Sequence, residues 1–339
     1  MPRDDRQAAK RVVLLGASAG GVEAISTVVA GLPADLPAAV LVVLHVPAWG
    51  TSVLPHILER SGPLPAHHAV DGEPLREGRV YVAPPDKHLV TEDGVVRLLL
   101  GPKENGVRPA IDTLFRSAAQ SHGPDTVAVV LSGTLDDGTA GLVSVKAHGG
   151  LTMVQDPSDA AFPGMPESAV RYARPNYVAA VRDIAALVAK HVRNGDDREP
   201  RGEANVAQEE GKHASAAEQE GLPSGLNCPE CGGSLWERAD GELLRFRCRV
   251  GHAYSPESLF SHQLESLEGA LWAAVVALQE RGDLAMRLAE RMERSGHRGR
   301  AHRYEDQAAD ARRKAEQVRT AIVHLSRSGE PAGEKAADQ

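Results

Sequence analysis

Apolar runs alternate with helical patterns over residues 11–193 of the chain. The runs are apolar at consecutive positions and rich in β-branched residues, which predicts parallel strands buried on both faces. They are Val12–Leu15, Val40–Leu44, Val127–Leu131 and Leu151–Val154. Helical periodicity covers residues 22–32, 52–59, 110–119 and 139–147 between them. The alternation predicts an α/β domain, a doubly wound and mostly parallel sheet with helices on both faces.

The stretch from Ala66 to Leu100 has a different pattern. Two short runs, Arg79–Val82 and Val95–Leu98, lie among turn residues such as Pro84-Pro85-Asp86 and Asp93-Gly94. Short strands bounded by such turns are typical of antiparallel pairs. We therefore expect antiparallel strands inserted at one edge of the sheet.

The pattern changes after residue 193. Residues 194–224 lack apolar periodicity and predict a flexible linker, and residues 225–255 form a compact Cys/His module. Residues 256–327 predict a helical hairpin or coiled-coil pair, interrupted at Ser295-Gly296. Its apolar seams are Leu264, Leu267, Leu271, Ala274, Leu278, Ala285, Leu288 and Met292, then Tyr304, Ala308, Ala311, Ala315, Val318, Ile322 and Leu325. Residues 1–10 and 328–339 are expected to be tails, the second disordered.

The net charge and the lack of long apolar runs argue against two kinds of partner, nucleic acids and membranes. The 339 residues carry 38 Lys and Arg against 46 Asp and Glu, a net charge of −8, so a nucleic-acid partner is not expected. The sequence has no apolar run of the roughly 20 residues that a membrane span needs, and its first residues lack the apolar core of a signal peptide. We therefore expect a cytoplasmic protein without membrane insertion.

The segment Gly16-Ala17-Ser18-Ala19-Gly20-Gly21 follows the first predicted strand and opens the first helix. Glycines permit a tight strand-to-helix turn, and the helix N-terminus supplies unpaired N–H groups. The pattern matches the G-x-S-x-G nucleophile elbow, which would make Ser18 a nucleophile. A phosphate-cradling turn is an equally good interpretation of this motif alone. The dinucleotide fingerprint G-x-G-x-x-G is absent.

A serine nucleophile needs a base and a group that orients the base. His45 ends the second predicted strand, and Asp136 and Asp137 follow the third. The carboxyl ends of parallel strands meet at one sheet edge, so a Ser, a His and an Asp are expected together there. Either aspartate is also suited to capping the helix that begins near Gly138.

Six separated motifs in this order resemble the catalytic domain of CheB, the chemotaxis protein-glutamate methylesterase. They are residues 16–21 (GASAGG), 44–47 (LHVP), 82–89 (VAPPDKHL), 108–112 (RPAID), 131–141 (LSGTLDDGTAG) and 164–169 (GMPESA). The resemblance implies that Ser18 is the nucleophile, His45 the base and Asp137 the orienter. It implies a serine carboxylic-ester hydrolase that needs no cofactor for catalysis. The expected substrates are glutamate γ-methyl esters on methyl-accepting chemoreceptors or a similar methylated protein, with glutamine deamidation as a further activity.

The chain departs from the family pattern in several places. Ala19 stands where a Thr is expected and Thr134 where a Met is expected. Residues 1–10 are the only ones given before the first strand, so we expect no phosphorylated receiver domain. Two alternatives stay open. One is a catalytically silent regulatory or scaffold protein that binds through its C-terminal part. The other is a serine esterase or amidase with a different protein substrate.

All three cysteines lie between residues 228 and 248, an odd number that argues against a disulfide framework. Cys228-Pro-Glu-Cys231 followed by Cys248-Arg-Val-Gly-His252 predicts a zinc-ribbon-like structural site with Cys228, Cys231, Cys248 and His252 as ligands. A closed site of this kind does not predict catalysis. Arg245, Arg247 and Arg249 alternate along one predicted strand and form either a contact for an acidic partner or a solvated face. The helices after the module suit self-association or docking to a partner helix, or an intramolecular pair.

Overall fold

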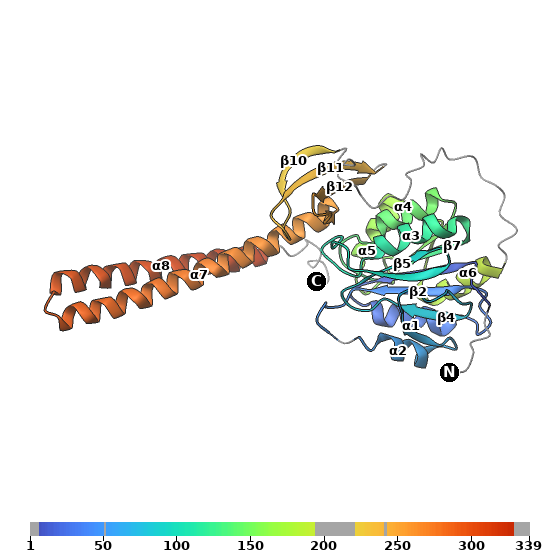
Figure 1. The fold of residues 1–339 in the computed structure, drawn as a ribbon, viewed down its shortest axis with the longest axis horizontal. Coiled ribbons are helices and arrows are strands. Elements are labelled where there is room, and N and C mark those ends of the chain that lie inside the picture. Colours follow the sequence, from blue (N-terminus) through green and yellow to red (C-terminus); the bar gives the residue numbers. More distant parts are fainter. Residues whose placement is uncertain (1–6, 51, 194–220, 241–242, 329–339) are drawn as a thin grey trace, which may run out of the picture. The chain divides into compact units, whose positions relative to one another are not determined.

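The computed structural model describes residues 7–50, 52–193, 221–240 and 243–328 (Figure 1). Its contacts divide the chain into two units, of which one ends at Leu259 and the other begins at Phe260. The predicted linker core (194–220) and most of the predicted tails (1–6 and 329–339) lie outside the described residues.

A seven-stranded parallel sheet is the centre of the first unit, in the order β3-β4-β2-β1-β7-β8-β9. Its strands are β1 (Val12–Ala17), β2 (Ala39–Leu44), β3 (Ala66–His68), β4 (Arg79–Val82), β7 (Thr126–Val130), β8 (Leu151–Gln155) and β9 (Tyr177–Ala179). The central strands β1, β2 and β7 are buried at every position, as continuous apolar runs require.

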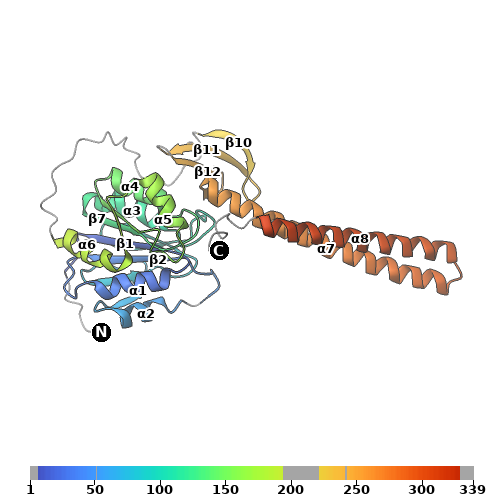
Figure 2. The same cartoon turned by 180° about the vertical axis from the view of Figure 1, so that it is seen from behind.

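Helices cover both faces of this sheet (Figures 1 and 2). Alternate residues of β1 belong to different cores, because Val13 and Leu15 join one apolar cluster and Val12 and Leu14 the other. The first cluster includes residues of α1 (Gly21–Gly31), α2 (Leu54–Ser61) and α6 (Val181–Arg193). The second includes residues of α3 (Ile111–His122), α4 (Thr139–Ala147), α5 (Gly164–Ser168) and a π-helical turn (Ala169–Ala173). A short 3-10 turn (Gly123–Asp125) leads into β7. The doubly wound α/β prediction is confirmed.

The segment 66–100 differs from its prediction in detail. The expected antiparallel pair exists, but it consists of β5 (His88–Glu92) and β6 (Val95–Leu99), which form a separate two-stranded sheet. Arg79–Val82 is instead a parallel strand inside the main sheet, between β3 and β2. The reason is burial: Val80, Tyr81 and Val82 are all buried, so this short run has no face to present to water.

The Cys/His module is a four-stranded antiparallel sheet in chain order. Its strands are β10 (Leu222–Asn227), β11 (Ser234–Asp240), β12 (Leu243–Cys248) and β13 (Ala253–Tyr254), so β10 begins inside the last residues of the predicted linker. Its small apolar core consists of Cys228, Leu235, Phe246, Cys248, Tyr254 and Leu259.

Two long helices, α7 (Pro256–Arg294) and α8 (Arg298–Ser328), form the predicted hairpin. Gly296, with φ +75°, lies in the turn between them. Val275, Ala285 and Ala289 are buried on α7, and so are Ala308, Ala311 and Ala315 on α8, while the predicted seam residue Leu267 is 47% exposed. The small side chains allow close approach: a Cβ added at Gly282 would lie 3.7 Å from that of Ala311.

None of the helices in the described residues combines the length and apolar character needed to cross a membrane.

Candidate active site and metal centre

Ser18 lies at the carboxyl edge of the sheet, in the turn that joins β1 to α1. Its N–H donates to the Ser132 carbonyl oxygen at 2.9 Å, and its carbonyl accepts from Gly21 N–H at 2.9 Å. Gly20 has φ +68°, and a Cβ there would lie 2.8 Å from Ser132 Oγ. At Gly21 a Cβ would lie 2.6 Å from the Ala17 Cβ. The turn therefore needs both glycines, and it leaves Ser18 half-buried.

Gly133 lies in the segment after β7, and its backbone packs closely against Ser18. A Cβ added to Gly133 would lie 2.9 Å from the Ser18 Cβ and 2.1 Å from Sδ of the buried Met165 on α5. No side chain larger than hydrogen fits between these groups. The glycine thus lets the segment after β7 approach the serine closely.

His45 follows β2 and contacts Asp137, which follows β7. The His45 Nε2 lies 2.8 Å from Asp137 Oδ2, and the two side chains are 15% and 3% exposed. The pairing of Ala17 with Leu44 explains why His45 is next to Ser18: each is the residue directly after a paired position on neighbouring strands. The structure therefore brings the three predicted residues to one sheet edge. Among the described residues, the Ser18 hydroxyl makes no hydrogen bond to His45, as is common before substrate binds.

Asp137 is held as a carboxylate. Burial alone would raise its pKa, but the hydrogen bond and charge of His45 and the N–H groups of Ile111 and Asp112 lower the pKa to about 2. Ile111 N–H donates to Oδ2 at 2.7 Å, and the N–H groups of Asp112 and Gly138 donate to Oδ1 at 3.1 and 3.0 Å. An ionised carboxylate only accepts, so the contact with Asp137 uses a hydrogen on His45 Nε2. The buried carboxylate thereby orients the imidazole ring.

Asn105 and Asp112 complete the surroundings of Asp137, and the sequence did not single out Asn105. Its Nδ2 donates to Asp137 Oδ1 at 3.0 Å and to Asp112 Oδ2 at 3.1 Å. Asp112 Oδ1 accepts from the N–H groups of Gly138 and Gly141 at 3.0 and 2.7 Å, which makes Asp112 the cap at the start of α4. An asparagine in a loop, outside any strand end, has no local sequence signal for such a role.

Two motif residues have structural partners. Arg108 pairs with Asp86, with Nη2 and Oδ1 2.6 Å apart, and donates to the Gly101 carbonyl. The buried His88 contacts the Pro102 carbonyl through Nε2 at 2.9 Å, and its Nδ1 accepts from Ala110 N–H at 3.2 Å. Burial lowers the pKa of His88. Both residues hold loops near the site.

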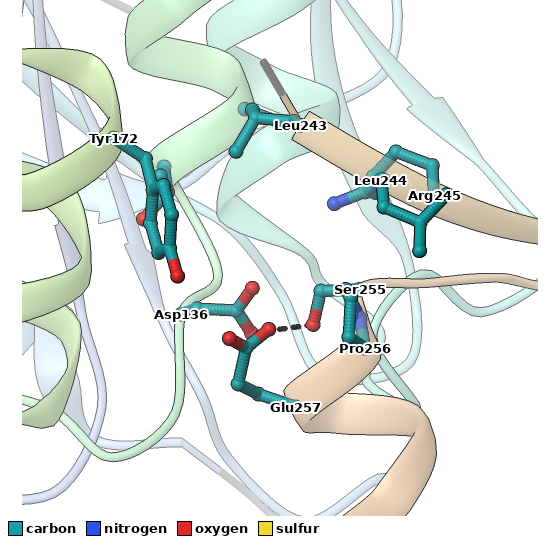
Figure 3. A pocket seen from close by; sticks show the side chains of 10 residues that line it. Asp136, Tyr172, Leu243, Leu244, Arg245, Ser255, Pro256 and Glu257 are labelled. Atoms are coloured by element: carbon teal, nitrogen blue, oxygen red, sulfur yellow. Dashed lines mark hydrogen bonds between the residues drawn. The ribbon is translucent and has the colours of Figure 1, made fainter. Parts of the chain in front are cut away.

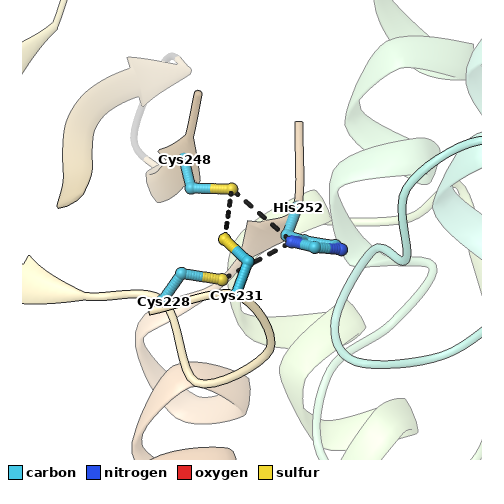
Figure 4. A group of neighbouring side chains, drawn as sticks. All are labelled: Cys228, Cys231, Cys248 and His252. Carbon is cyan, nitrogen blue, oxygen red and sulfur yellow. Dashed lines mark hydrogen bonds between the residues drawn. The ribbon is translucent and has the colours of Figure 1, made fainter. Parts of the chain in front are cut away.

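The predicted metal ligands lie together in the module (Figure 4). One donor atom from each of Cys228, Cys231, Cys248 and His252 lies within 4.8 Å of all the others. The His252 Nδ1 lies 3.6 Å from the Cys228 Sγ and 3.5 Å from the Cys248 Sγ, and the Cys231 and Cys248 sulfurs are 3.7 Å apart. This cluster could hold a metal ion.

Residues 13–188, within the first unit, are similar to known proteins. The family model described as CheB methylesterase matches residues 13–188. A Methanosarcina mazei protein named protein-glutamate methylesterase/protein-glutamine glutaminase 2 is 34% identical over 197 residues, which are 56% of this chain and 54% of the relative. A Leptospira interrogans protein named putative protein-glutamate methylesterase/protein-glutamine glutaminase is 35% identical, covering 52% of this chain and 91% of the relative.

A solved structure of the same family has a similar fold. The Thermotoga maritima CheB methylesterase catalytic domain is 34% identical, with a TM-score of 0.51, over 53% of this chain and 97% of that one. The chain spans about half the length of several curated relatives, including the one from M. mazei and one from Anaeromyxobacter dehalogenans. From the fold, the site geometry and the match over residues 13–188, the chain belongs to the CheB methylesterase family.

Proposed function

We propose that the chain is a protein-glutamate methylesterase that hydrolyses glutamate γ-methyl esters on a chemoreceptor or similar methylated protein, with Ser18 as nucleophile, His45 as base and Asp137 as orienter. The observation that carries the proposal is the 2.8 Å contact between His45 Nε2 and Asp137 Oδ2, at the sheet edge where the glycine turn presents Ser18. The names of the relatives support the substrate class and a glutaminase activity.

In the first half of the reaction, Nδ1 of His45 takes the Ser18 proton as Oγ attacks the ester carbonyl carbon. Asp137 holds the Nε2–H and stabilises the imidazolium. The negative oxygen of the tetrahedral intermediate meets N–H groups at the start of α1, which have no partner within the helix. The intermediate collapses, the C–O bond to the methoxy group breaks, and methanol leaves with the proton from His45.

In the second half, His45 takes a proton from water as the water oxygen attacks the glutamyl ester of Ser18. Collapse returns the proton from His45 to Ser18 Oγ and releases the glutamic acid side chain, which loses its own proton to solvent and becomes the carboxylate. A glutamine side chain follows the same path with ammonia as the leaving group, so one site serves both activities of the named relatives.

An esterase or amidase with another protein substrate is the second candidate. Thr134 and Leu135 are exposed directly after Gly133, next to the serine, and Thr134 departs from the expected family residue. Substitution at an exposed position beside the nucleophile changes substrate contacts without removing the reacting groups.

The test measures methanol release from methylated chemoreceptor membranes and labelling of the protein by a fluorophosphonate. Wild type should release methanol and be labelled at Ser18, and Ser18→Ala should do neither. Ser61→Ala is the matched control, because Ser61 ends α2 and donates to the Ile57 carbonyl. Labelling without methanol release would favour the second candidate, and a wild type without either would leave a catalytically silent protein.

We further propose that Cys228, Cys231, Cys248 and His252 hold a structural zinc ion. Zinc–sulfur bonds of about 2.3 Å and zinc–nitrogen bonds of about 2.0–2.1 Å in a tetrahedron set S···S edges of about 3.8 Å and S···N edges of about 3.5 Å. The separations of 3.7 Å and of 3.5 and 3.6 Å support this assignment. Four protein ligands close the site, so the ion would stabilise the module and take no part in ester hydrolysis.

A further inference from the structure

The segment from Gly101 to Val107 lies between the catalytic domain and the Cys/His module and contacts both. On the module side, Asn105 N–H donates to the Ala253 carbonyl at 2.7 Å, and Ala253 N–H donates to the Lys103 carbonyl at 3.3 Å. The Lys103 ammonium lies 2.7 Å from Glu230 Oε1. Ala253 directly follows the candidate metal ligand His252 in the chain. The module therefore holds this loop by backbone and side-chain bonds.

Asn105 transmits this contact to the triad. Its Oδ1 accepts from Ser255 N–H at 3.2 Å and from Ser258 Oγ at 3.3 Å, on the module side. Its Nδ2 donates to Asp112 and Asp137, on the catalytic side. The side chain is 4% exposed and φ is +51°, so both its orientation and its backbone are fixed by these partners. One amide group thus joins the module to the catalytic aspartate.

Arg245 on β12 supplies a positive charge beside the buried carboxylate of Asp112. Its Nη1 lies 3.0 Å from Asp112 Oδ2, and its Nη2 lies 3.7 Å from Glu104 Oε2. Asp112 is fully buried and Arg245 is 13% exposed. Arg116 pairs with Glu104 on the other side. The buried groups that interact electrostatically with Asp112 are therefore the carboxyl groups of Asp137, Glu104 and Asp136 and the guanidinium groups of Arg245 and Arg116.

The ionisation of Asp112 decides where the Asn105 amide points. Burial raises the pKa of Asp112, and Arg245 is the foremost of the charges that oppose this shift. Asp112 Oδ2 accepts from Asn105 Nδ2 and Arg245 Nη1, and its Oδ1 accepts from two backbone N–H groups, so donors occupy both oxygens and the geometry favours the ionised carboxylate. A proton on Oδ2 would face the Asn105 donor, and the amide would have to leave its place between the two carboxylates.

We propose that Arg245 is a positioning residue for the catalytic triad, which acts through Asp112 and Asn105 to fix Asp137 against His45. This inference rests on the proposed function, because it assigns a role in the reaction of Ser18. Arg245 lies outside the family match at residues 13–188, so this contribution comes from the module. The three alternating arginines of this strand therefore differ. Arg245 pairs with Asp112 of the same chain, while Arg247 and Arg249 are exposed.

The test compares full-length variants by the rate and the final extent of fluorophosphonate labelling at Ser18. Arg245→Ala should label roughly 10-fold to 100-fold more slowly, with the same final stoichiometry as wild type. Arg245→Lys should recover part of the rate, because it restores a cation without the paired guanidinium geometry. Arg247→Ala, on the same strand but exposed, should label as wild type does.

A double-substitution cycle separates positioning from folding. Asn105→Ala should slow labelling like Arg245→Ala, and the double variant should be no slower than the slower single variant, since both act through one contact chain. A wild-type labelling rate in Arg245→Ala overturns the proposal. A lower final extent with an unchanged rate also overturns it, because that pattern means only a smaller folded fraction.

A second measurement keeps the inference separate from the proposed function. If wild type is not labelled, the serine mechanism fails, and the proton NMR signal of the His45 Nε2–H still reports its bond to Asp137. That downfield signal should be lost or shifted in Arg245→Ala and kept in Arg247→Ala. An unchanged signal in Arg245→Ala would contradict the positioning role.

Discussion

Two neighbouring aspartates, Asp136 and Asp137, have opposite electrostatic surroundings. Asp137 is surrounded by donors, which lower its pKa to about 2 against the effect of burial. Asp136 is buried with fewer donors: burial raises its pKa to about 7, and the nearby Asp112 adds to the rise, although Ser255 Oγ donates to Asp136 Oδ1 at 2.8 Å. Figure 3 shows this bond in a pocket lined also by Tyr172, Leu243 and Glu257. The surroundings thus separate the two carboxyl groups by ionisation, and of the two only Asp137 stays ionised throughout the neutral range.

The raised pKa of Asp136 predicts a loss of stability as the pH rises. The folded protein keeps the proton that the unfolded chain releases near its ordinary pKa of 3.8, so the unfolded state binds fewer protons between about pH 4 and pH 7. The free energy of unfolding should therefore fall across this window. Asp136→Asn should reduce that fall by on the order of 2–4 kcal/mol, measured by denaturant unfolding at pH 4.5 and pH 7.5.

The control for this experiment is Asp183→Asn, an exposed carboxylate on α6. It should leave the pH dependence of unfolding as in wild type. Asp137 acts in a different window, because its lowered pKa contributes stability above about pH 4 that is lost as the pH falls toward 2. An Asp136→Asn protein with the wild-type slope between pH 4.5 and pH 7.5 would contradict the assignment to Asp136.

At the residue level, the sequence predicted the groups that end strands and missed those that reach the site from loops. Ser18, His45 and Asp137 each follow a central parallel strand, so topology alone brings them to one edge. Asn105 and Arg245 reach Asp112 from a loop and from a module more than a hundred residues later in the chain. No periodicity or spacing in the sequence relates these positions, because their contact exists only after the module docks.

At the level of elements, the turn after β1 and the turn after β7 depend on each other. Ser18 N–H donates to the Ser132 carbonyl, and Gly133 then passes beside the Ser18 Cβ. Long-range pairing also explains why β4 was not predicted as a parallel strand. Its four residues lie between turns, and nothing in their local sequence shows which strands they pair with. Their direction in the sheet is determined by pairing with β2 and β3. The long runs of β1, β2 and β7 were predictable because each is apolar throughout.

The close approach at Gly133 predicts a large effect of one added carbon. Gly133→Ala places a Cβ 2.1 Å from Met165 Sδ and 2.9 Å from the Ser18 Cβ, so one of these groups must move. We expect a loss of about 1–3 kcal/mol of stability and slower fluorophosphonate labelling of Ser18 than in wild type. Gly269→Ala is the matched control, since a Cβ there meets nothing within 4 Å and its helix should gain about 0.5–1 kcal/mol. Wild-type stability and labelling in Gly133→Ala would refute this account of the turn.

At the level of the whole molecule, the proposed metal site and the proposed esterase site share one loop. His252 is a candidate ligand, the next residue bonds to the 101–107 loop, and Asn105 of that loop bonds to Asp137. Metal binding is coupled to folding in small modules that have little apolar core, and the described residues of this module form an apolar cluster of six. The two sites are therefore expected to respond together.

Chelation of the proposed zinc ion should change both the proposed metal site and the proposed esterase site. Removal should release about one equivalent of zinc, measured with a colorimetric zinc indicator, and hydrogen exchange should increase in residues 221–255 and 101–107. Labelling of Ser18 should slow at the same time, and added zinc should restore all three readouts. The same treatment of the Arg245→Ala protein should change labelling much less. Zinc release that leaves exchange in residues 101–107 unchanged would contradict the coupling.

The buried state of Asp112 and Asp136 limits how freely the catalytic part can be recombined with other sequences. Arg245 and Ser255, which face these carboxyl groups, follow residues 194–220 in the chain, so a piece that ended at Arg193 would open both acids to water. The α/β part of this chain therefore depends on the module for two of its buried contacts. A fusion partner that replaced the module would have to supply a cation of its own to Asp112.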